Sequence, residues 1–316
     1  MSVRAAVQAA FGPDLTIDGT DSIHRFSLVW WARVHAPGGD VPAVVKRTWG
    51  SGQHALEAWQ RVLVGRGVRT VAPLLPPVDV TIEEDGEGRR ERWVAYPRLR
   101  GRGWDGSSTD VAAAGRLLGT MHAASTDLAI EGFPVFEWGT DAADSIAEDV
   151  EAVRRSTAEH WPHADPGPWI AALERFGDTL RAMRAAALPC IPASLDHRAA
   201  NLLFDDEGAM TVDLENAALA PRLLDLALAV LLFPLEDVGC AGRALSGEEW
   251  RAFLAGYLAE APPLGATERS AWPTALEYMR MEWGTWHLTE GVETDPANLA
   301  YLEDLLTLDA ERFALP

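Results

Sequence analysis

The sequence feature that most constrains the fold is a change of texture near residue 106. Before it, two apolar runs rich in Val and Trp, at 27–36 and 42–49, flank a turn containing Gly and Pro, a pattern typical of paired antiparallel strands. A second hairpin is predicted where "VDVTI" and "RWVAYPRL" flank an acidic turn. After residue 106, apolar residues three and four apart predict successive helices over 109–124, 141–159, 167–188, 223–233, 247–260 and 268–290.

The two textures predict an α+β fold with a small antiparallel-sheet lobe followed by a larger helical lobe. A length of 316 residues with 48% hydrophobic residues is enough for two cores. We place the boundary at the linker 96–101, so that residues 1–100 form the first lobe and residues 101–316 the second. One helix falls within the first lobe, in "GQHALEAWQRVLVGRG", and it is predicted to expose Glu57.

The composition limits the classes of partner. Lys and Arg number 27 against 47 Asp and Glu, and the net charge of −20 argues against a nucleic-acid-binding surface. Such acidity suits either a cationic substrate or simply a solubilising surface. The sequence shows no signal-peptide pattern and no stretch of eighteen uncharged apolar residues, so we expect a cytoplasmic protein without a membrane span. Cys190 and Cys240 lack metal-binding spacing and are expected to be free, mostly buried thiols.

A single hairpin is predicted to interrupt the helical lobe, in "NLLFDDEGAMTVDLE" at 201–215. The turn "DDEG" lies between two apolar runs, and pairing about it places Asn201 opposite Val212 or Asp213. Asp196 lies five residues before Asn201, close enough to face the same cleft. One carboxylate and one amide suit Mg²⁺ that keeps water and phosphate ligands, and a third, offset carboxylate suits a base that orients a hydroxyl. Ordinary capping and turn residues are the alternative interpretation of the same three side chains.

Lys46 is the sole lysine of the chain and lies late in a strand pattern, in "VVK". A lone lysine on a half-buried strand is often an edge charge. Glu57, on the helix that follows, offers an ion-pair partner, and such a pair is suited to holding the α- and β-phosphates of a nucleotide.

These segments together resemble the aminoglycoside phosphotransferase and choline kinase group of protein-kinase-like folds. The resemblance rests on "D-x4-N" at 196–201, "VDLE" at 212–215, "LLDLA" at 223–227 and the "VVK…E" of 44–57, and it runs through nearly the whole chain. It implies that Asp196 is the catalytic base and that Asn201 and Asp213 hold Mg²⁺. It further implies that Lys46, paired with Glu57, holds ATP, and that Asp225 braces the catalytic loop.

The resemblance also assigns the nucleotide and acceptor regions. The linker "YPRLRG" matches the family hinge, so the backbone near Tyr96, Pro97 and Leu99 is expected to meet adenine. The late helices of the family line the acceptor site. This makes Glu282, Trp286 and Glu290 the candidates for recognising the acceptor, whereas His122 is expected to be structural.

The sequence departs from the family pattern at three places. Ser194 stands where the family usually has His two residues before the catalytic Asp, a position that mainly supports the loop. Arg198 stands where protein kinases place a Lys near the γ-phosphate, and it is a candidate for contact with that phosphate. The loop 19–27 has one Gly, so Ser22 and backbone amides would cover the phosphates. A literal G-x-G-x-x-G at Gly101, Gly103 and Gly106 is judged fortuitous, because a dinucleotide site would need a following parallel strand.

The sequence therefore predicts an ATP- and Mg²⁺-dependent O-phosphotransferase whose partner is a small molecule with an acceptor hydroxyl. Antibiotics that carry sugar or amino-sugar hydroxyls come first by resemblance. A metabolite kinase for choline, homoserine or a sugar is the alternative, and a non-catalytic, nucleotide-binding pseudokinase is a second one. The choice between ATP and GTP and the oligomeric state are left open.

Overall fold

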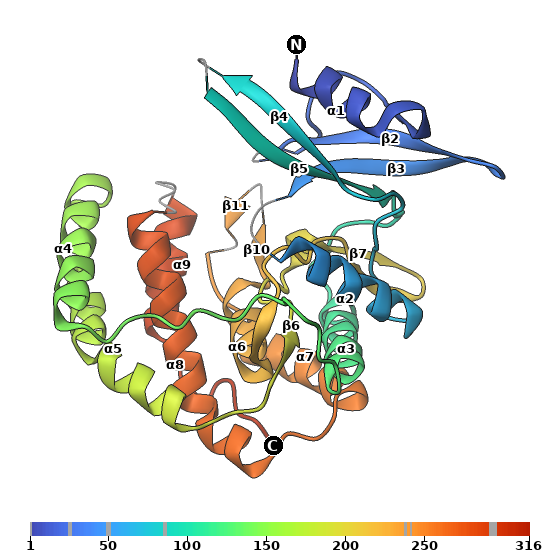
Figure 1. The fold of residues 1–316 in the computed structure, drawn as a ribbon. Helices are drawn as coiled ribbons and strands as arrows, with labels where there is room; N and C mark the ends of the chain where they lie inside the picture. Colours follow the sequence, from blue (N-terminus) through green and yellow to red (C-terminus); the bar gives the residue numbers. More distant parts are fainter. Residues whose placement is uncertain are drawn as a thin grey trace.

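A computed structural model of the chain describes residues 2–24, 27–48, 52–84, 87–236, 239–240, 242–290 and 296–316 (Figure 1). The first hundred residues contain a five-stranded sheet in which all pairs are antiparallel, in the order β1-β2-β3-β5-β4. Its strands are β1 (Leu15–Ile17), β2 (Val29–Ala36), β3 (Gly39–Thr48), β4 (Val78–Glu84) and β5 (Glu87–Pro97), accompanied by the helices α1 (Val3–Phe11) and α2 (Gln53–Gly65).

The two faces of this sheet have different roles. On one face Trp30 stacks on Trp93, with ring centroids 4.8 Å apart, and Val45 packs beside them under α1. Because successive residues of a strand point to opposite faces, Val44 and Lys46 of β3 lie on the other face. Both of these residues line a cleft. The alternation of β3 therefore places the sole lysine of the chain at the wall of a cavity.

The helix α2 belongs, by its packing, to the core of the helical part. Its buried residues Leu56 and Trp59 lie in the same hydrophobic cluster as α3 and the later helices, whereas the sheet and α1 form a separate cluster. The Trp59 indole N–H donates to the Ser125 hydroxyl at 3.0 Å, at the end of α3. A boundary at residue 100 falls in the linker, but it does not separate the two hydrophobic cores, because α2 lies before it and packs in the core of the helical part. The boundary stays a prediction.

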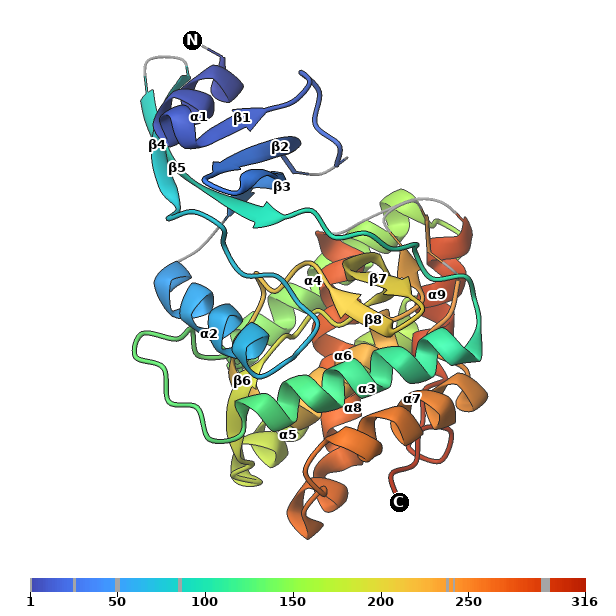
Figure 2. The ribbon, with the colours of Figure 1, turned by 90° about the vertical axis from the view of Figure 1, so that its right-hand side faces the viewer.

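The helical part is built around one closely packed helix pair, α3 (Ser108–Ser125) and α7 (Gly247–Glu260), which lie side by side in Figure 2. Glycine makes the approach possible, because a Cβ at Gly115 would overlap the carbonyl of Phe253, and a Cβ at Gly256 would overlap that of Ala112. The remaining helices are α4 (Ala143–His160), α5 (Gly167–Ala185), α6 (Arg222–Leu232), α8 (Ala266–Thr289) and α9 (Pro296–Leu306).

Short strand pairs lie within the helical part. The predicted hairpin is present as β7 (Leu202–Asp205) and β8 (Gly208–Thr211), with Leu202 opposite Thr211. The expectation that one hairpin alone interrupts the helices was wrong. β6 (Cys190–Ala193) pairs with β9 (Ala218–Pro221), and β10 (Leu235–Glu236) pairs with β11 (Gly239–Cys240). Strands of two to four residues carry too little periodicity to be distinguished from loops in the sequence.

The predicted α+β class, with a sheet part followed by a helical part, is confirmed. The six predicted long helices are present, whereas α1 and α9 were not foreseen. Cys190 is exposed, contrary to the expectation of a buried thiol, because it begins an edge strand; the side chain of Cys240 lies outside the description. No helix within the described ranges combines the length and apolar character needed to cross a bilayer.

Candidate functional site

A cleft of about 270 Å³ lies between the open face of the sheet and the β7–β8 hairpin. Val29 and Val44 line it from the sheet, and Leu203 and Val212 line it from the hairpin. Apolar side chains on two opposed walls suit a flat, apolar ring such as a nucleobase. Polar residues from both sides, among them Lys46, Asn201 and Asp213, line the same cavity.

The predicted hinge forms one edge of the cleft. Tyr96, Pro97 and Leu99 all line it, and the guanidinium of Arg98 lies 3.9 Å from the ring centroid of Trp31 at the same edge. The Arg98 N–H donates to the carbonyl of Pro42 at 3.0 Å, so this amide is already used within the protein. Adenine recognition by this hinge stays a prediction.

The linker that follows is fixed to the hairpin. Arg102 and Phe204 exchange two backbone hydrogen bonds, of 2.9 and 2.8 Å, and a Cβ at Gly101 would approach within 2.9 Å of the Leu203 Cβ. Gly101, the first glycine of the fortuitous G-x-G-x-x-G, therefore permits the close approach of the linker to β7. The strand pairs described after it are antiparallel, and the parallel contact among the described residues is an isolated bridge between Val135 and Leu219.

Lys46 does not pair with Glu57, which corrects the prediction. The Lys46 ammonium lies 2.6 Å from Asp213 Oδ2 and 3.3 Å from Glu215 Oε2. Glu57 is buried rather than exposed, and its Oε1 accepts from Arg92 of β5 at 3.1 Å. The helix α2 packs on α3, and this placement brings Glu57 to Arg92 of β5, the neighbouring strand, instead of to Lys46 of β3. Burial lowers the pKa of Lys46, but the two carboxylates outweigh it and raise the pKa above its ordinary value.

Asn201 and Asp213 have the chemistry to hold a hard cation. They lie together at the open end of the hairpin, where the Val212 N–H donates to the carbonyl of Asn201 at 3.0 Å, as the sequence pairing predicted. The Asn201 amide nitrogen donates to the backbone carbonyl of Asp196 at 3.1 Å, which leaves the amide oxygen for a cation. No cluster of three or more His, Cys, Asp or Glu side chains suited to a metal occurs among the described residues. One carboxylate and one amide oxygen fit Mg²⁺ that takes its other ligands from water and phosphate.

Asp225 holds the loop that carries Asp196 in place. The buried carboxylate of Asp225 accepts hydrogen bonds from the backbone N–H groups of Ser194 and Leu195, at 2.8 and 3.0 Å, and from the Ser194 hydroxyl at 3.0 Å. Leu195 has φ 54°, a conformation that costs free energy in a non-glycine residue. His122, on α3, lies 3.1 Å from the same carboxylate. The geometry is that of a strained loop fixed immediately before Asp196.

Burial alone would raise the pKa of Asp225, but the hydrogen bond and charge of His122 and the N–H of Ser194 lower it below its ordinary value. Asp225 therefore stays ionised. The buried imidazole of His122 contacts Asp225 on one side and the Tyr257 hydroxyl on the other, at 3.0 Å. These contacts are those of a structural residue.

Asp196 has the electrostatics of a base that works near neutral pH. Burial raises its pKa to about 6, opposed by Arg198, whose Nε lies 3.0 Å from Asp196 Oδ1, and assisted by the nearby charge of Asp213. The Asn216 amide donates to Asp196 Oδ2 at 2.9 Å. Both carboxylate oxygens are thereby oriented, one by a guanidinium and one by an amide. The Arg198 guanidinium contacts the carboxylate of Asp196. A contact between Arg198 and a phosphate stays a prediction.

The predicted phosphate loop is only partly described, since residues 25 and 26 fall outside the described ranges. The Ser22 hydroxyl donates to the Ser27 carbonyl at 2.7 Å and accepts from the Val29 N–H at 3.1 Å, so it closes its own loop. His24 and Ser27, rather than Ser22, line the cleft among the described residues. A direct contact of the Ser22 side chain with phosphate would require this loop to open.

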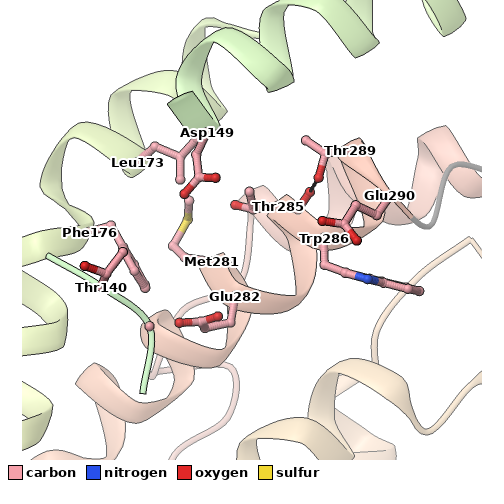
Figure 3. Close-up of a pocket in the computed structure, with 11 residues that line it drawn as sticks. Thr140, Asp149, Leu173, Phe176, Met281, Glu282, Thr285, Trp286, Thr289 and Glu290 are labelled. Carbon is pink, nitrogen blue, oxygen red and sulfur yellow. Dashed lines mark hydrogen bonds between the residues drawn. The ribbon is translucent and has the colours of Figure 1, made fainter. Parts of the chain in front are cut away.

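A second cavity, of about 250 Å³, lies among α4, α5 and α8 (Figure 3). The three acceptor candidates Glu282, Trp286 and Glu290 line it, together with Asp149 of α4. Figure 3 shows Phe176 at one end and Trp286 with Glu290 at the other. Burial and the neighbouring Asp149 raise the pKa of Glu282, and burial with the charges of Glu148 and Glu290 raises that of Asp149. A cavity with carboxylates and apolar side chains suits a ligand that is cationic and partly apolar.

The sequence interpretation missed two polar residues that contact the site, Glu215 and Asn216, and it missed Arg92, the partner of Glu57. Glu215 follows Asp213 by two residues in the quoted "VDLE", and burial raises its pKa to about 7 against the opposing charge of Lys46. Its position in the motif was a signal that could have been used. Arg92 and Asn216 carry no local signal, because their partners lie 35 and 20 residues away in the sequence.

The model of the phosphotransferase enzyme family matches residues 38–272. No curated protein sequence matches the chain. Among solved structures, an amicoumacin kinase, hAmiN, in complex with AMP-PNP, Ca²⁺ and Ami is similar with a TM-score of 0.63 and 16% identity, over 99% of this chain and 92% of that one.

Two further structures have a TM-score of 0.57 and 16% identity. One is an aminoglycoside phosphotransferase from Alicyclobacillus acidocaldarius, similar over 99% of this chain and 93% of that one. The other is a microcompartment-associated aminopropanol kinase, similar over 95% and 91%. At this level of identity, the similarity shows the fold.

Proposed function

The chain belongs to the phosphotransferase enzyme family and is a small-molecule kinase, and on that premise we propose that it transfers the γ-phosphate of ATP to a hydroxyl of an amine-bearing acceptor, with Mg²⁺ as the metal. The observation that carries the proposal is the convergence at one cleft. Lys46 from the sheet, and Asn201 and Asp213 from the hairpin, all line the cavity between two apolar walls.

In this proposal the residues of the chain position the reactants. Lys46 binds the α- and β-phosphates, and Asn201 with Asp213 holds Mg²⁺, which when bound neutralises charge that develops on the phosphates. Asp196, ionised above its pKa of about 6, accepts the hydroxyl proton and directs the oxygen in line with the γ-phosphate. Arg198 and Asn216 orient its carboxylate. Asp225 keeps the loop in place without touching the reactants.

The second cavity supports an acceptor that carries an amine. Glu282, Asp149 and Glu290 supply negative charge, and Trp286, 45% exposed, supplies an aromatic surface for a cation. Aminopropanol and aminoglycosides, which name two of the similar structures, are hydroxyl compounds with amino groups. We place antibiotics first among the acceptors and small amino alcohols second.

The test is an ADP-release assay with MgATP and paired acceptors that differ in one amino group, run beside Asp196→Asn. Turnover with amine-bearing acceptors that falls at least about 100-fold in Asp196→Asn is the expected result. Near wild-type turnover in Asp196→Asn would contradict the assigned base. Equal turnover with the paired acceptors would contradict the amine requirement. Mg²⁺-dependent nucleotide binding without turnover on any acceptor would favour the pseudokinase alternative.

A further inference from the structure

The cavity among α4, α5 and α8 contains two buried polar atoms without hydrogen-bond partners. Glu282 and Thr285 of α8 both line it, and neither Glu282 Oε1 nor Thr285 Oγ1 has a partner among the described residues. The two residues are three positions apart and therefore neighbours on one face of the helix. In Figure 3 both side chains project to the side of the cavity where Asp149 and Thr140 lie. Because a buried polar atom without a partner costs free energy, a ligand is the expected source of the missing partner.

The contrast with Thr289 shows what is particular about the Thr285 hydroxyl. Thr289 lies one turn further along α8 and also lines the cavity, and its hydroxyl donates to the Thr285 carbonyl at 2.9 Å (Figure 3). A threonine within a helix often satisfies its hydroxyl in this way, at the carbonyl four residues before it. The Thr285 hydroxyl has no such bond. Its lone pairs are therefore available to a ligand in the cavity.

The chain satisfies the Glu282 carboxylate only in part. Burial raises its pKa, the nearby Tyr278 hydroxyl opposes this shift, and the charge of Asp149 adds to it. The Tyr278 hydroxyl in turn accepts from the Gly139 N–H at 3.1 Å. Oε1 of Glu282 is left without a hydrogen bond. A donor that also carries positive charge would satisfy this oxygen and offset the repulsion between Glu282 and Asp149.

The unsatisfied atoms determine which kind of cation fits. A primary ammonium group has N–H donors for Glu282 Oε1 and Thr285 Oγ1, whereas a quaternary ammonium has the same charge and no N–H. Quaternary ammonium groups are instead recognised by cages of aromatic side chains. Phe176 and Trp286 are the aromatic residues that line this cavity among the described ones, and they lie at its opposite ends in Figure 3. The lining therefore suits hydrogen bonding to an amine better than enclosure of methyl groups.

We propose that this cavity binds a primary ammonium group of the acceptor through its N–H donors, and that Glu282 and Thr285 select primary over quaternary amines. Thr285 is thereby assigned as a specificity-determining residue beside the three acceptor candidates. This inference rests on the proposed function, since it specifies the class of amine that the proposed acceptor carries.

The experiment titrates the chain, without nucleotide, with 3-amino-1-propanol and with its N,N,N-trimethyl analogue at neutral pH. The two probes have the same hydroxyl and the same charge, and they differ in N–H donors and in size. Binding is read from the NMR signal of the Met281 methyl group, because Met281 lines the cavity. We expect the primary amine to bind at least about tenfold more tightly, because it gives partners to two buried atoms.

Two matched variants separate hydrogen bonding from size. Thr285→Val removes the unpaired hydroxyl and keeps the shape of the side chain, whereas Thr289→Val removes a hydroxyl that is already bonded within the helix. The preference for the primary amine is expected to fall at least about threefold in Thr285→Val and to change less than about twofold in Thr289→Val. An unchanged preference in Thr285→Val would mean that size alone excludes the trimethyl group, and would overturn the inference.

Thermal unfolding of Thr285→Val gives an independent readout. The variant is expected to melt no lower than the wild type, because it replaces a buried polar atom that has no partner. A clearly lower melting temperature would show that the chain itself satisfies this hydroxyl, which contradicts the proposal.

The remaining outcomes distinguish this inference from the proposed function. Equal or tighter binding of the trimethyl analogue would overturn the inference, and so would the absence of a Met281 shift with both probes at millimolar concentrations. Neither result tests phosphate transfer, which the ADP-release assay with Asp196→Asn decides separately. Turnover that depends on Asp196 but is equal for primary and quaternary amino alcohols would leave the kinase function in place and overturn the selection of primary amines.

Discussion

The carboxylate of Asp225 accepts the backbone N–H of Ser194 at 2.8 Å and the Ser194 hydroxyl at 3.0 Å. One buried charge on α6 thereby fixes both the main chain and the side chain of the residue two positions before Asp196. The departure from the family pattern at position 194 is accommodated, since the serine hydroxyl contacts the anchoring aspartate directly. The same carboxylate accepts a third hydrogen bond, from the Leu195 N–H, and this bond stabilises the strained backbone of Leu195 at φ 54°.

Ser194→Ala is expected to lower the free energy of unfolding by about 1–3 kcal/mol, because the buried Asp225 charge loses one of its donors. The backbone hydrogen bonds remain, so kcat is expected to fall while the KM for ATP changes little. Chemical denaturation and steady-state kinetics measure the two effects. Ser108→Ala, at an exposed position, is the control. A KM effect larger than the kcat effect would contradict a role confined to the loop.

Glu282→Gln is expected to raise the KM for an amine-bearing acceptor about tenfold and to leave the KM for ATP unchanged, because the carboxylate lines the second cavity and not the cleft. Steady-state kinetics with each substrate varied in turn makes the measurement. An acceptor lacking the amine should show no such change in the same variant. If the KM for ATP rose instead, the second cavity would not be the acceptor site.

His197 is predicted to make stability depend on pH. Burial lowers its pKa to about 4, while its ring contacts the Ala114 carbonyl at 3.0 Å. The unfolded chain binds a proton below about pH 6.5, but the folded chain does not until about pH 4, so stability falls as pH decreases through this window. The loss amounts to about 3 kcal/mol at most.

Urea unfolding of the wild type and of His197→Gln between pH 7 and pH 4 tests this expectation. The difference between the two chains should shrink as the pH falls, because the variant lacks the titrating group. A difference that is constant over the whole range would show that the buried imidazole does not titrate as proposed.

Gly256→Ala is expected to lower the free energy of unfolding by about 1–3 kcal/mol or more, because the added Cβ overlaps the Ala112 carbonyl and pushes α7 from α3. Thermal unfolding gives the measurement. Gly38→Ala, where a Cβ meets no atom within 4 Å, is the matched control. Equal melting temperatures for the two variants would contradict close packing of α3 on α7.

The sequence predicted the features that depend on residues close together along the chain. The β7–β8 register placed Asn201 beside Val212, because the acidic, glycine-containing turn fixes the pairing of the strands next to it. The strand pattern that contains Lys46 is present as β3, in which alternation puts Lys46 and the buried Val45 on different faces of the sheet. Such features follow from residues within a few positions of each other.

The partner of Lys46 could not be obtained in this way. Glu57 lies eleven residues away in the sequence, whereas Asp213 lies 167 away and is 2.6 Å from it in space. The choice depends on where α2 packs as a rigid body, and α2 is held on α3 by Trp59 and Leu56 rather than beneath the sheet. The short strands β6 and β9 escaped prediction for a related reason, because they are defined by their pairing with each other and not by their own periodicity.

The sequence by itself determined the α+β class, the long helices, the β7–β8 hairpin and the choice of Lys46, Asn201 and Asp213 as candidates that line one cleft, because each follows from a period, a turn or a motif read along the chain. The tertiary structure decided which charged and polar side chains pair with one another. The Lys46, Asp213 and Glu215 group, the Glu57 pair with Arg92 and the hold of Asp225 on Ser194 join segments far apart in the sequence. Such contacts are fixed by how whole elements pack, and packing is a property of the folded chain.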